Sequence, residues 1–144
     1  MIDKIQPKGL LVATLYRDGK IVYQYETHNL ILNSGLSQIA GLVAGIQTAY
    51  YNTMVIGTAI PTLSATDTSL AGSVMATTTT NTLITTTVPN DTAKFVGTFN
   101  FTGSYTLYGA MLQLAGGTPL AEGSLGSITA VNGDLLVLSW AIQF

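Results

Sequence analysis

A tight turn between two β-prone runs is the feature that most constrains the fold of this chain. Residues 9–16 (GLLVATLY) are mostly apolar, and Asp18-Gly19 follows them after Arg17. Glycine accepts the positive φ that hairpin turns require. Residues 21–28 (IVYQYETH) then alternate in a way that places successive side chains on opposite faces of a strand. We therefore predict a β-hairpin over residues 9–28.

The remainder of the chain repeats this pattern of short β-prone runs between turn residues. In the segment 74–89, the eleven residues TTTTNTLITTT hold eight threonines, and β-branched residues favour strands. We expect either one long strand or an irregular hairpin there, with a bend at 79–82. Gly97 is a candidate β-bulge, and residues 60–73 are expected to form a loop. The other expected strands are 52–59, 92–103, 104–117 and 135–144, whereas 118–130 is broken by Pro119, Gly123 and Gly126.

One segment, HNLILNSGLSQIAGLVAG at 28–45, differs because its apolar residues follow a helical period. Asn33 or Ser34 can cap a helix start, and Gly45 can end it. The apolar face is expected to hold Leu36, Ile39, Ala40 and Val43, at i, i+3, i+4 and i+7. A helix of about ten residues is marginal alone, so we expect it to plug one end of the sheet structure or to cover an open edge.

Six to eight strands and one short helix, at about residues 34–45, predict an all-β fold, a jelly-roll-like sandwich or barrel. The length of 144 residues suits one domain. We assign residues 9–144 to a single β domain and treat residues 1–8 as a candidate docking arm.

The charge content is low for a protein of this size. Charged residues make up 8% of the chain, hydrophobic residues make up 47%, and the net charge is -2, whereas soluble domains carry about 25% charge. Such a surface meets little repulsion on contact, which favours a subunit buried in an assembly. Five cations are too few for a nucleic-acid surface, and no apolar run reaches the length of a membrane span.

Residues that could carry chemistry are sparse. His28 is the only histidine, and there is no cysteine. The segment 123–127 (GSLGS) lacks the pattern of a nucleophile elbow. The carboxylates are scattered, and Asp18, Asp67, Asp91 and Asp134 lie in expected turns. We therefore predict no enzyme activity, no catalytic residues, no metal site and no cofactor. Seven tyrosines leave open a carbohydrate-binding face.

The order of four segments resembles a recurring class of small virion proteins of tailed phages. These segments are ETHNLILNSGLSQIAGLVAG, then IGTA with PTLSATDTSLAG, then AKFVGTFNFTGSYTLYGAMLQ, and finally NGDLLVLSWAIQF. Within this class the chain is most similar to the auxiliary head proteins, which decorate and cement capsids. The resemblance implies a β domain without an active site, assembled as a trimer on the capsid lattice.

On this basis we expect a decoration protein that binds the major capsid protein on the outer surface of a phage head. It would be made in the host cytoplasm and would contact neither nucleic acid nor membrane. Ile2, Ile5, Pro7 and Lys8 are the candidate capsid-docking residues, because isolated apolar residues near a terminus are easily ordered on a partner. A component of the tail tip, the baseplate or a fibre attachment is the alternative, and a glycan binder is a third hypothesis.

Overall fold

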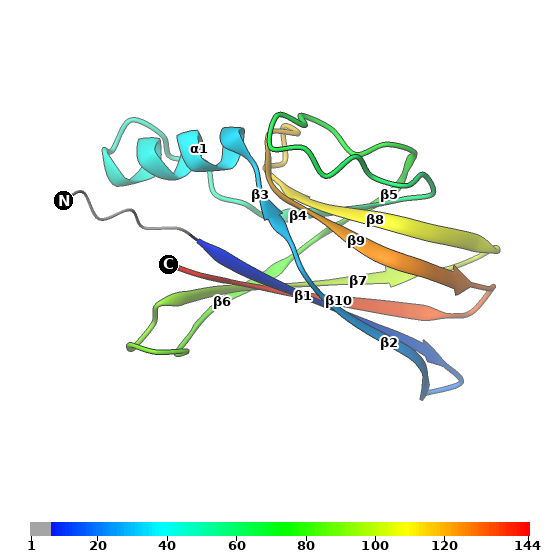
Figure 1. The fold of residues 1–144 in the computed structure, drawn as a ribbon. Helices are drawn as coiled ribbons and strands as arrows, with labels where there is room; N and C mark the ends of the chain where they lie inside the picture. Colours follow the sequence, from blue (N-terminus) through cyan, green and yellow to red (C-terminus); the bar gives the residue numbers. More distant parts are fainter. Residues whose placement is uncertain (1–6) are drawn as a thin grey trace.

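The structure, a computed structural model, describes residues 7–144 and consists of two antiparallel five-stranded sheets that face each other (Figure 1). The first sheet has the strand order β2-β1-β10-β7-β6, and the second has the order β3-β9-β8-β4-β5. The predicted all-β sandwich with one short helix is confirmed. The elements are β1 (Lys8–Arg17), β2 (Lys20–His28), β3 (Leu30–Ile31), α1 (Asn33–Val43), β4 (Thr53–Gly57), β5 (Ser73–Thr78), β6 (Thr80–Ile84), β7 (Thr92–Asn100), β8 (Tyr105–Gln113), β9 (Pro119–Ala130) and β10 (Leu135–Gln143).

The predicted first hairpin is present. β1 and β2 pair from Leu10 opposite His28 to Arg17 opposite Lys20. Asp18 and Gly19 both have positive φ, 53° and 75°, which is the backbone twist of a two-residue hairpin turn.

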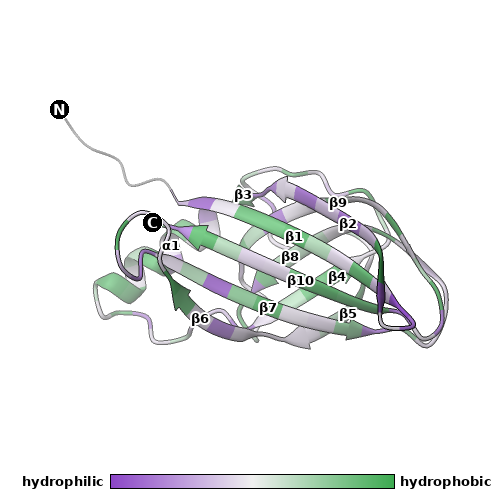
Figure 2. Cartoon of the chain, turned by 90° about the horizontal axis from the view of Figure 1, so that it is seen from below, coloured by the Kyte–Doolittle hydropathy of each residue, from purple (hydrophilic) through white to green (hydrophobic). Residues whose placement is uncertain are grey.

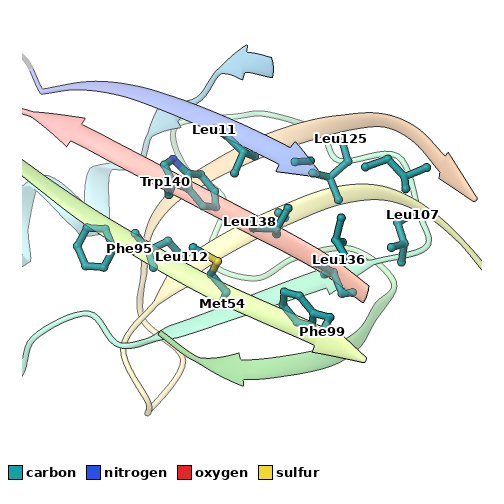
Figure 3. Close-up of a cluster of buried hydrophobic side chains, with 14 of the residues drawn as sticks. Leu11, Met54, Phe95, Phe99, Leu107, Leu112, Leu125, Leu136, Leu138 and Trp140 are labelled. Carbon is teal, nitrogen blue, oxygen red and sulfur yellow. The ribbon is translucent and has the colours of Figure 1, made fainter. Parts of the chain in front are cut away.

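The core lies between the two sheets and is built from alternate residues of the facing strands. β10 shows the pattern most clearly, because Leu136, Leu138, Trp140 and Ile142 are all fully buried while their neighbours are partly exposed. Figure 3 shows Trp140 between Leu11 of β1 and Phe95 of β7, the residues paired with it on either side. Strict alternation of this kind is the signature of a strand with one face on the core.

The threonine-rich segment forms neither one long strand nor a hairpin. β5 pairs with β4 in one sheet, whereas β6 pairs with β7 in the other. The chain changes sheets at Thr79, inside the range where a bend was expected, and the Thr79 N–H donates to Asn52 O at 2.8 Å. Threonine is suited to both strands, because its methyl group can pack against neighbouring side chains while its hydroxyl group can be hydrated.

Two expectations about glycine and proline were wrong. Residues 118–130 are not broken, since β9 runs continuously from Pro119 to Ala130 and absorbs two shifts of register against β8. Gly97 is not at a bulge, because β7 pairs regularly with β10 through the position opposite Leu138. Its glycine is needed for another reason: a Cβ there would lie 2.8 Å from Sδ of Met54 on the facing sheet.

Helix α1 begins one residue earlier than predicted and presents a different face. The N-cap position is Leu32 and has no side-chain cap bond; the hydroxyl of Ser34 donates instead to Pro119 O at 2.9 Å. Within α1 the buried residues are Gly35 and Gln38, whereas Leu36 and Val43 of the predicted apolar face are exposed.

α1 covers the first residues of β9, beyond the two-residue strand β3. The Leu32 N–H donates to Leu120 O at 2.9 Å, which extends the short β3–β9 ladder to the start of the helix. Gly35 then lies so close that a Cβ would be 2.5 Å from Leu120 O and 2.8 Å from its Cα. The helix is therefore seated by contact of its backbone with β9.

This contact gives the first testable prediction, a pair of substitutions in one helix. Gly35→Ala should lower the free energy of unfolding by about 2 kcal/mol, because the new methyl group would overpack against backbone. The matched control is Gly41→Ala, whose methyl group would meet the movable side chain of Gln47 and would also improve helix propensity. That variant should remain within about 1 kcal/mol of the wild type. Urea denaturation measures both, and equal effects of the two variants would contradict this seating.

The 58–72 loop covers the outer face of the second sheet. Leu70 of this loop joins Leu32, Val55 and Met111 in a small buried cluster separate from the main core. Cβ atoms at Gly57 and Gly109 would meet the backbone of Ala71 and the ring of Pro61, respectively. Both faces of this sheet are therefore covered around β4 and β8.

Candidate interaction surface

An open apolar groove of about 400 Å³ lies at one end of the sandwich, between α1 and the first sheet. The C-terminal half of α1 and strands β6 and β7 of the first sheet form its walls, and the segment 50–51 forms its floor. It is lined by Ile39, Leu42, Val43, Tyr50, Tyr51, Asn81, Thr82, Leu83, Ala93, Phe95, Leu120 and Phe144. No lining side chain carries a charge. We call this the end groove.

Large apolar side chains stand exposed around the end groove. Val43 is 86% exposed, Tyr50 67%, Leu83 64% and Phe144 47%; we call these four residues the groove rim. In Figure 2 the hydrophobic colour appears on α1 and at the end of β6. A single exposed apolar residue is ordinary, whereas several around an apolar concavity mark an interaction site.

Hydrogen bonds from two side-chain amides hold the segment that forms the floor of the end groove. Gln38 of α1 donates through Nε2 to Ala49 O at 2.9 Å. Asn81 of β6 donates through Nδ2 to Tyr51 O at 2.8 Å. These two amide side chains clamp residues 49–51 from opposite sides, which explains why the polar Gln38 is buried in α1. The end groove is thus a formed part of the fold.

Tyr51, in the floor of the end groove, has a buried hydroxyl group without a hydrogen-bond partner among the described residues. Its side chain is 5% exposed. Burial raises the pKa of Tyr51 to about 12, so the phenol is neutral at any physiological pH. The floor therefore remains uncharged like the walls.

Strand β6 adds a free sheet edge beside the end groove. It is the last strand of its sheet and pairs with β7 alone. Its backbone N–H and C=O groups on the other side are open to a further strand. An occupant of the end groove could therefore combine apolar contacts with backbone hydrogen bonds.

The predicted docking residues fall partly outside the described part of the chain. Ile2 and Ile5 lie outside it. Pro7 is half-buried, and Lys8 is the first residue of β1, paired with Gln143. Gln143 is the last residue of β10, and the next residue, Phe144, belongs to the groove rim. The start of β1, at Lys8, therefore lies beside the end of β10 that reaches the end groove.

Sequence reasoning missed the end groove, although two of its signals were visible. Ile39 and Val43 were assigned to the apolar face of the helix, and both line the end groove. A helical stripe identifies an apolar face but does not say whether the partner belongs to the same chain. The contribution of Leu83 depends on the pairing of β6, which local sequence does not reveal.

The residues with catalytic potential do not assemble into a site. His28 is exposed at the end of β2, on the surface. In residues 7–144 no three His, Cys, Asp or Glu side chains are grouped as a metal would need. The Ser124 hydroxyl accepts a hydrogen bond from the Gly126 N–H at 3.1 Å within β9, so it serves the local turn of the strand.

Three of the turn aspartates, Asp67, Asp91 and Asp134, each accept a local backbone hydrogen bond, as the sequence predicted. Asp91 accepts from the backbone N–H groups of Thr86, Thr87 and Val88, and these bonds hold its pKa well below the usual range. Asp134 accepts two bonds from Arg17, at 2.9 and 2.8 Å. This pairing lowers the pKa of Asp134 to about 2 and ties the turn before β10 to the first hairpin.

The tyrosines do not share one face. Tyr23 and Tyr25 stack on β2 with ring centroids 6.5 Å apart, whereas Tyr105 packs against Phe101. Tyr50 and Tyr51 lie at the end groove. The fold therefore does not bring the tyrosines together into one carbohydrate-binding face.

Comparison with known proteins returned no match to any family model, curated protein or solved structure. In residues 7–144 no helix is long and apolar enough to cross a membrane.

Proposed function

We propose that this chain is a non-enzymatic virion protein that decorates the outer surface of a phage capsid and stabilises the shell. The observation that carries the proposal is the end groove with its exposed apolar rim, on a chain with 8% charged residues. The order of the sequence motifs supports the assignment to a virion. The proposed partner is the major capsid protein, and the proposed assembly is a homotrimer on the capsid lattice.

The mechanism of such docking is burial of apolar area. Each exposed apolar side chain that leaves water contributes roughly 25 cal/mol per Å², and the end groove needs no ionic partner. Repetition over a lattice and a trimer converts modest single contacts into lasting attachment through effective concentration. Attachment of this kind should persist at high salt, since no charged side chain lines the end groove.

Copy number is the first measurement that tests this function. Mass spectrometry of purified particles would compare the amount of this chain with that of the most abundant capsid protein. A ratio near one-to-one, or a simple lattice fraction, is expected for a decoration protein. A few copies to a few dozen per particle would assign the chain to the tail tip, the baseplate or a fibre attachment. Absence from particles would overturn the virion assignment.

A charge placed on the groove rim should weaken docking. Leu83→Glu is expected to lower capsid affinity at least tenfold, because burying an unpaired carboxylate opposes apolar contact. Leu83 is 64% exposed, so stability should change by no more than about 0.5 kcal/mol.

The matched control for this variant is Ile21→Glu, because Ile21 is 57% exposed in the hairpin at the opposite end of the sandwich (Figure 1). Both variants are added to shells that lack the protein, and occupancy is counted after sedimentation. Equal occupancy of the two variants would contradict a role for the end groove.

Deletion of residues 2–6 tests the proposed docking arm separately. We expect loss of capsid binding with an unchanged fold, because β1 begins at Lys8 and the deletion leaves its pairing with β10 complete. Sedimentation with shells and circular dichroism are the two readouts. Full occupancy by the shortened chain would remove the arm from the proposal while leaving the end groove untouched.

A further inference from the structure

Glu122 is a buried carboxyl group on the outer face of the second sheet. It belongs to β9 and is 1% exposed. Its register partners are Leu30 on β3 and Met111 on β8, both of which are uncharged. The 58–72 loop covers this face from outside, since Leu70 of the loop packs against Met111, the register partner of Glu122 on β8.

No positive charge in the described residues compensates this carboxyl group. The ion pair there is Arg17–Asp134, which joins other elements. One oxygen of Glu122, Oε1, is shielded from water and has no hydrogen-bond donor in residues 7–144. A buried carboxylate without a counter-charge is costly, so the neutral form is favoured at this place.

Asp67 of the covering loop is the titratable group that interacts with Glu122: this interaction is the largest cause that lowers the pKa of Asp67, and after burial it is the next cause that raises the pKa of Glu122. Asp67 Oδ2 already accepts hydrogen bonds from the Thr62 hydroxyl and from the Ser64 N–H, the latter at 3.0 Å. After the interaction with Glu122, these two bonds are the next causes that lower the pKa of Asp67 and favour its ionised form. Asp67 is thus prepared to accept a hydrogen bond from Glu122, and Glu122 can donate one only when it carries a proton.

We propose that Asp67 and Glu122 share a single proton and that this proton latches the 58–72 loop onto the second sheet. When the proton leaves, two like charges face each other across a buried contact. The loop then separates more readily from the cluster of Leu32, Val55, Leu70 and Met111 that it covers. The result is a pH-dependent cover over an apolar face distinct from the end groove.

The direction of the pH dependence follows from the pKa of Glu122. Burial, followed by the contact with Asp67, raises that pKa from 4.5 to about 7 while the loop is closed. When the loop is open, the ordinary value returns. The latch is therefore fully effective below about pH 4.5, weakens as pH rises toward 7, and is lost above that value. Asp67 is ionised throughout this window.

Hydrogen exchange of the backbone amides in residues 58–72 tests the latch in the intact protein. After correction for the intrinsic pH dependence of exchange, the opening equilibrium of the loop should rise about 30-fold between pH 5 and pH 8. Glu122→Gln should abolish this rise, because the amide donates to Asp67 at every pH. Asp67→Asn should move the rise to lower pH, since its amide can donate to an ionised Glu122.

Three results would overturn the latch. The first is exchange in the wild type that does not depend on pH beyond the intrinsic rate. The second is an undiminished rise in Glu122→Gln, or, where that variant fails to fold, a midpoint in Asp67→Asn that does not move. The third is restoration of protection at pH 8 by added Ca²⁺, which would make the pair a cation site instead.

Discussion

Trp140→Ala is expected to lower the free energy of unfolding by about 3–5 kcal/mol, because it empties the largest buried position in the core. Trp140 is fully buried on β10, which is the central strand of the first sheet. Its indole reaches the facing sheet, where a Cβ on Gly123 would lie 3.7 Å from Cζ2. A cavity there would adjoin both sheets and could not collapse without moving one of them.

The matched control is Trp140→Phe, which keeps an aromatic ring and removes only part of the volume. The indole Nε1 is buried without a hydrogen-bond partner among the described residues, so this change leaves no acceptor unpaired. We expect it to lose less than half as much stability as Trp140→Ala. Urea unfolding followed by circular dichroism gives both values. A near-neutral alanine variant would mean that the indole does not lie in the core.

Glu122→Gln should make stability less dependent on pH, and this is the second large expected effect. The pKa of Glu122 rises from 4.5 to about 7 on folding, so the folded protein binds more protons than the unfolded chain between these values. Wild-type stability must then fall as pH rises through this window. The pKa difference sets an upper limit of about 3 kcal/mol, and solvent screening at the loop reduces the expected value to about 2 kcal/mol.

The measurement is the difference in unfolding free energy between wild type and Glu122→Gln at a series of pH values. All other titrating groups are common to both proteins and cancel in this difference. The variant should gain about 2 kcal/mol relative to wild type between pH 4.5 and pH 7.5, with no further change above. A difference that stays constant over this range would show that Glu122 is ionised in the folded protein.

The strands of this protein could be predicted because their information is local. Asp18-Gly19 determines a turn by its backbone preference, and the apolar residues of 135–144 predict the last strand. Where these patterns were present, the structure confirmed them.

Glycine and threonine were harder to interpret, because their roles depend on what lies opposite. Gly97 and Gly123 lie in regular strands, and each leaves space for a side chain of the other sheet. The Thr79 crossing is a similar case: threonine suits either sheet, and only the pairing partners of β5 and β6 decide where one strand ends.

The candidate sites depended even more on tertiary structure. Leu83 and Val43 are forty residues apart and meet at the end groove only because β6 joins the first sheet while α1 is seated on β9. Asp67 and Glu122 meet because the 58–72 loop folds back over β9. In the sequence these two carboxyl groups are an ordinary turn aspartate and an ordinary strand glutamate.

The sequence alone therefore determined the all-β class, the first hairpin, the short helix and the core strand that carries Trp140. Those features follow from backbone preferences and from apolar periods that act within a few residues. Tertiary structure alone decided which face of α1 is buried, where the chain changes sheets, and which side chains form the end groove and the carboxyl pair. These features depend on contacts between segments that are distant in the sequence. Such contacts form, and stabilise the fold, only when the two sheets pack together.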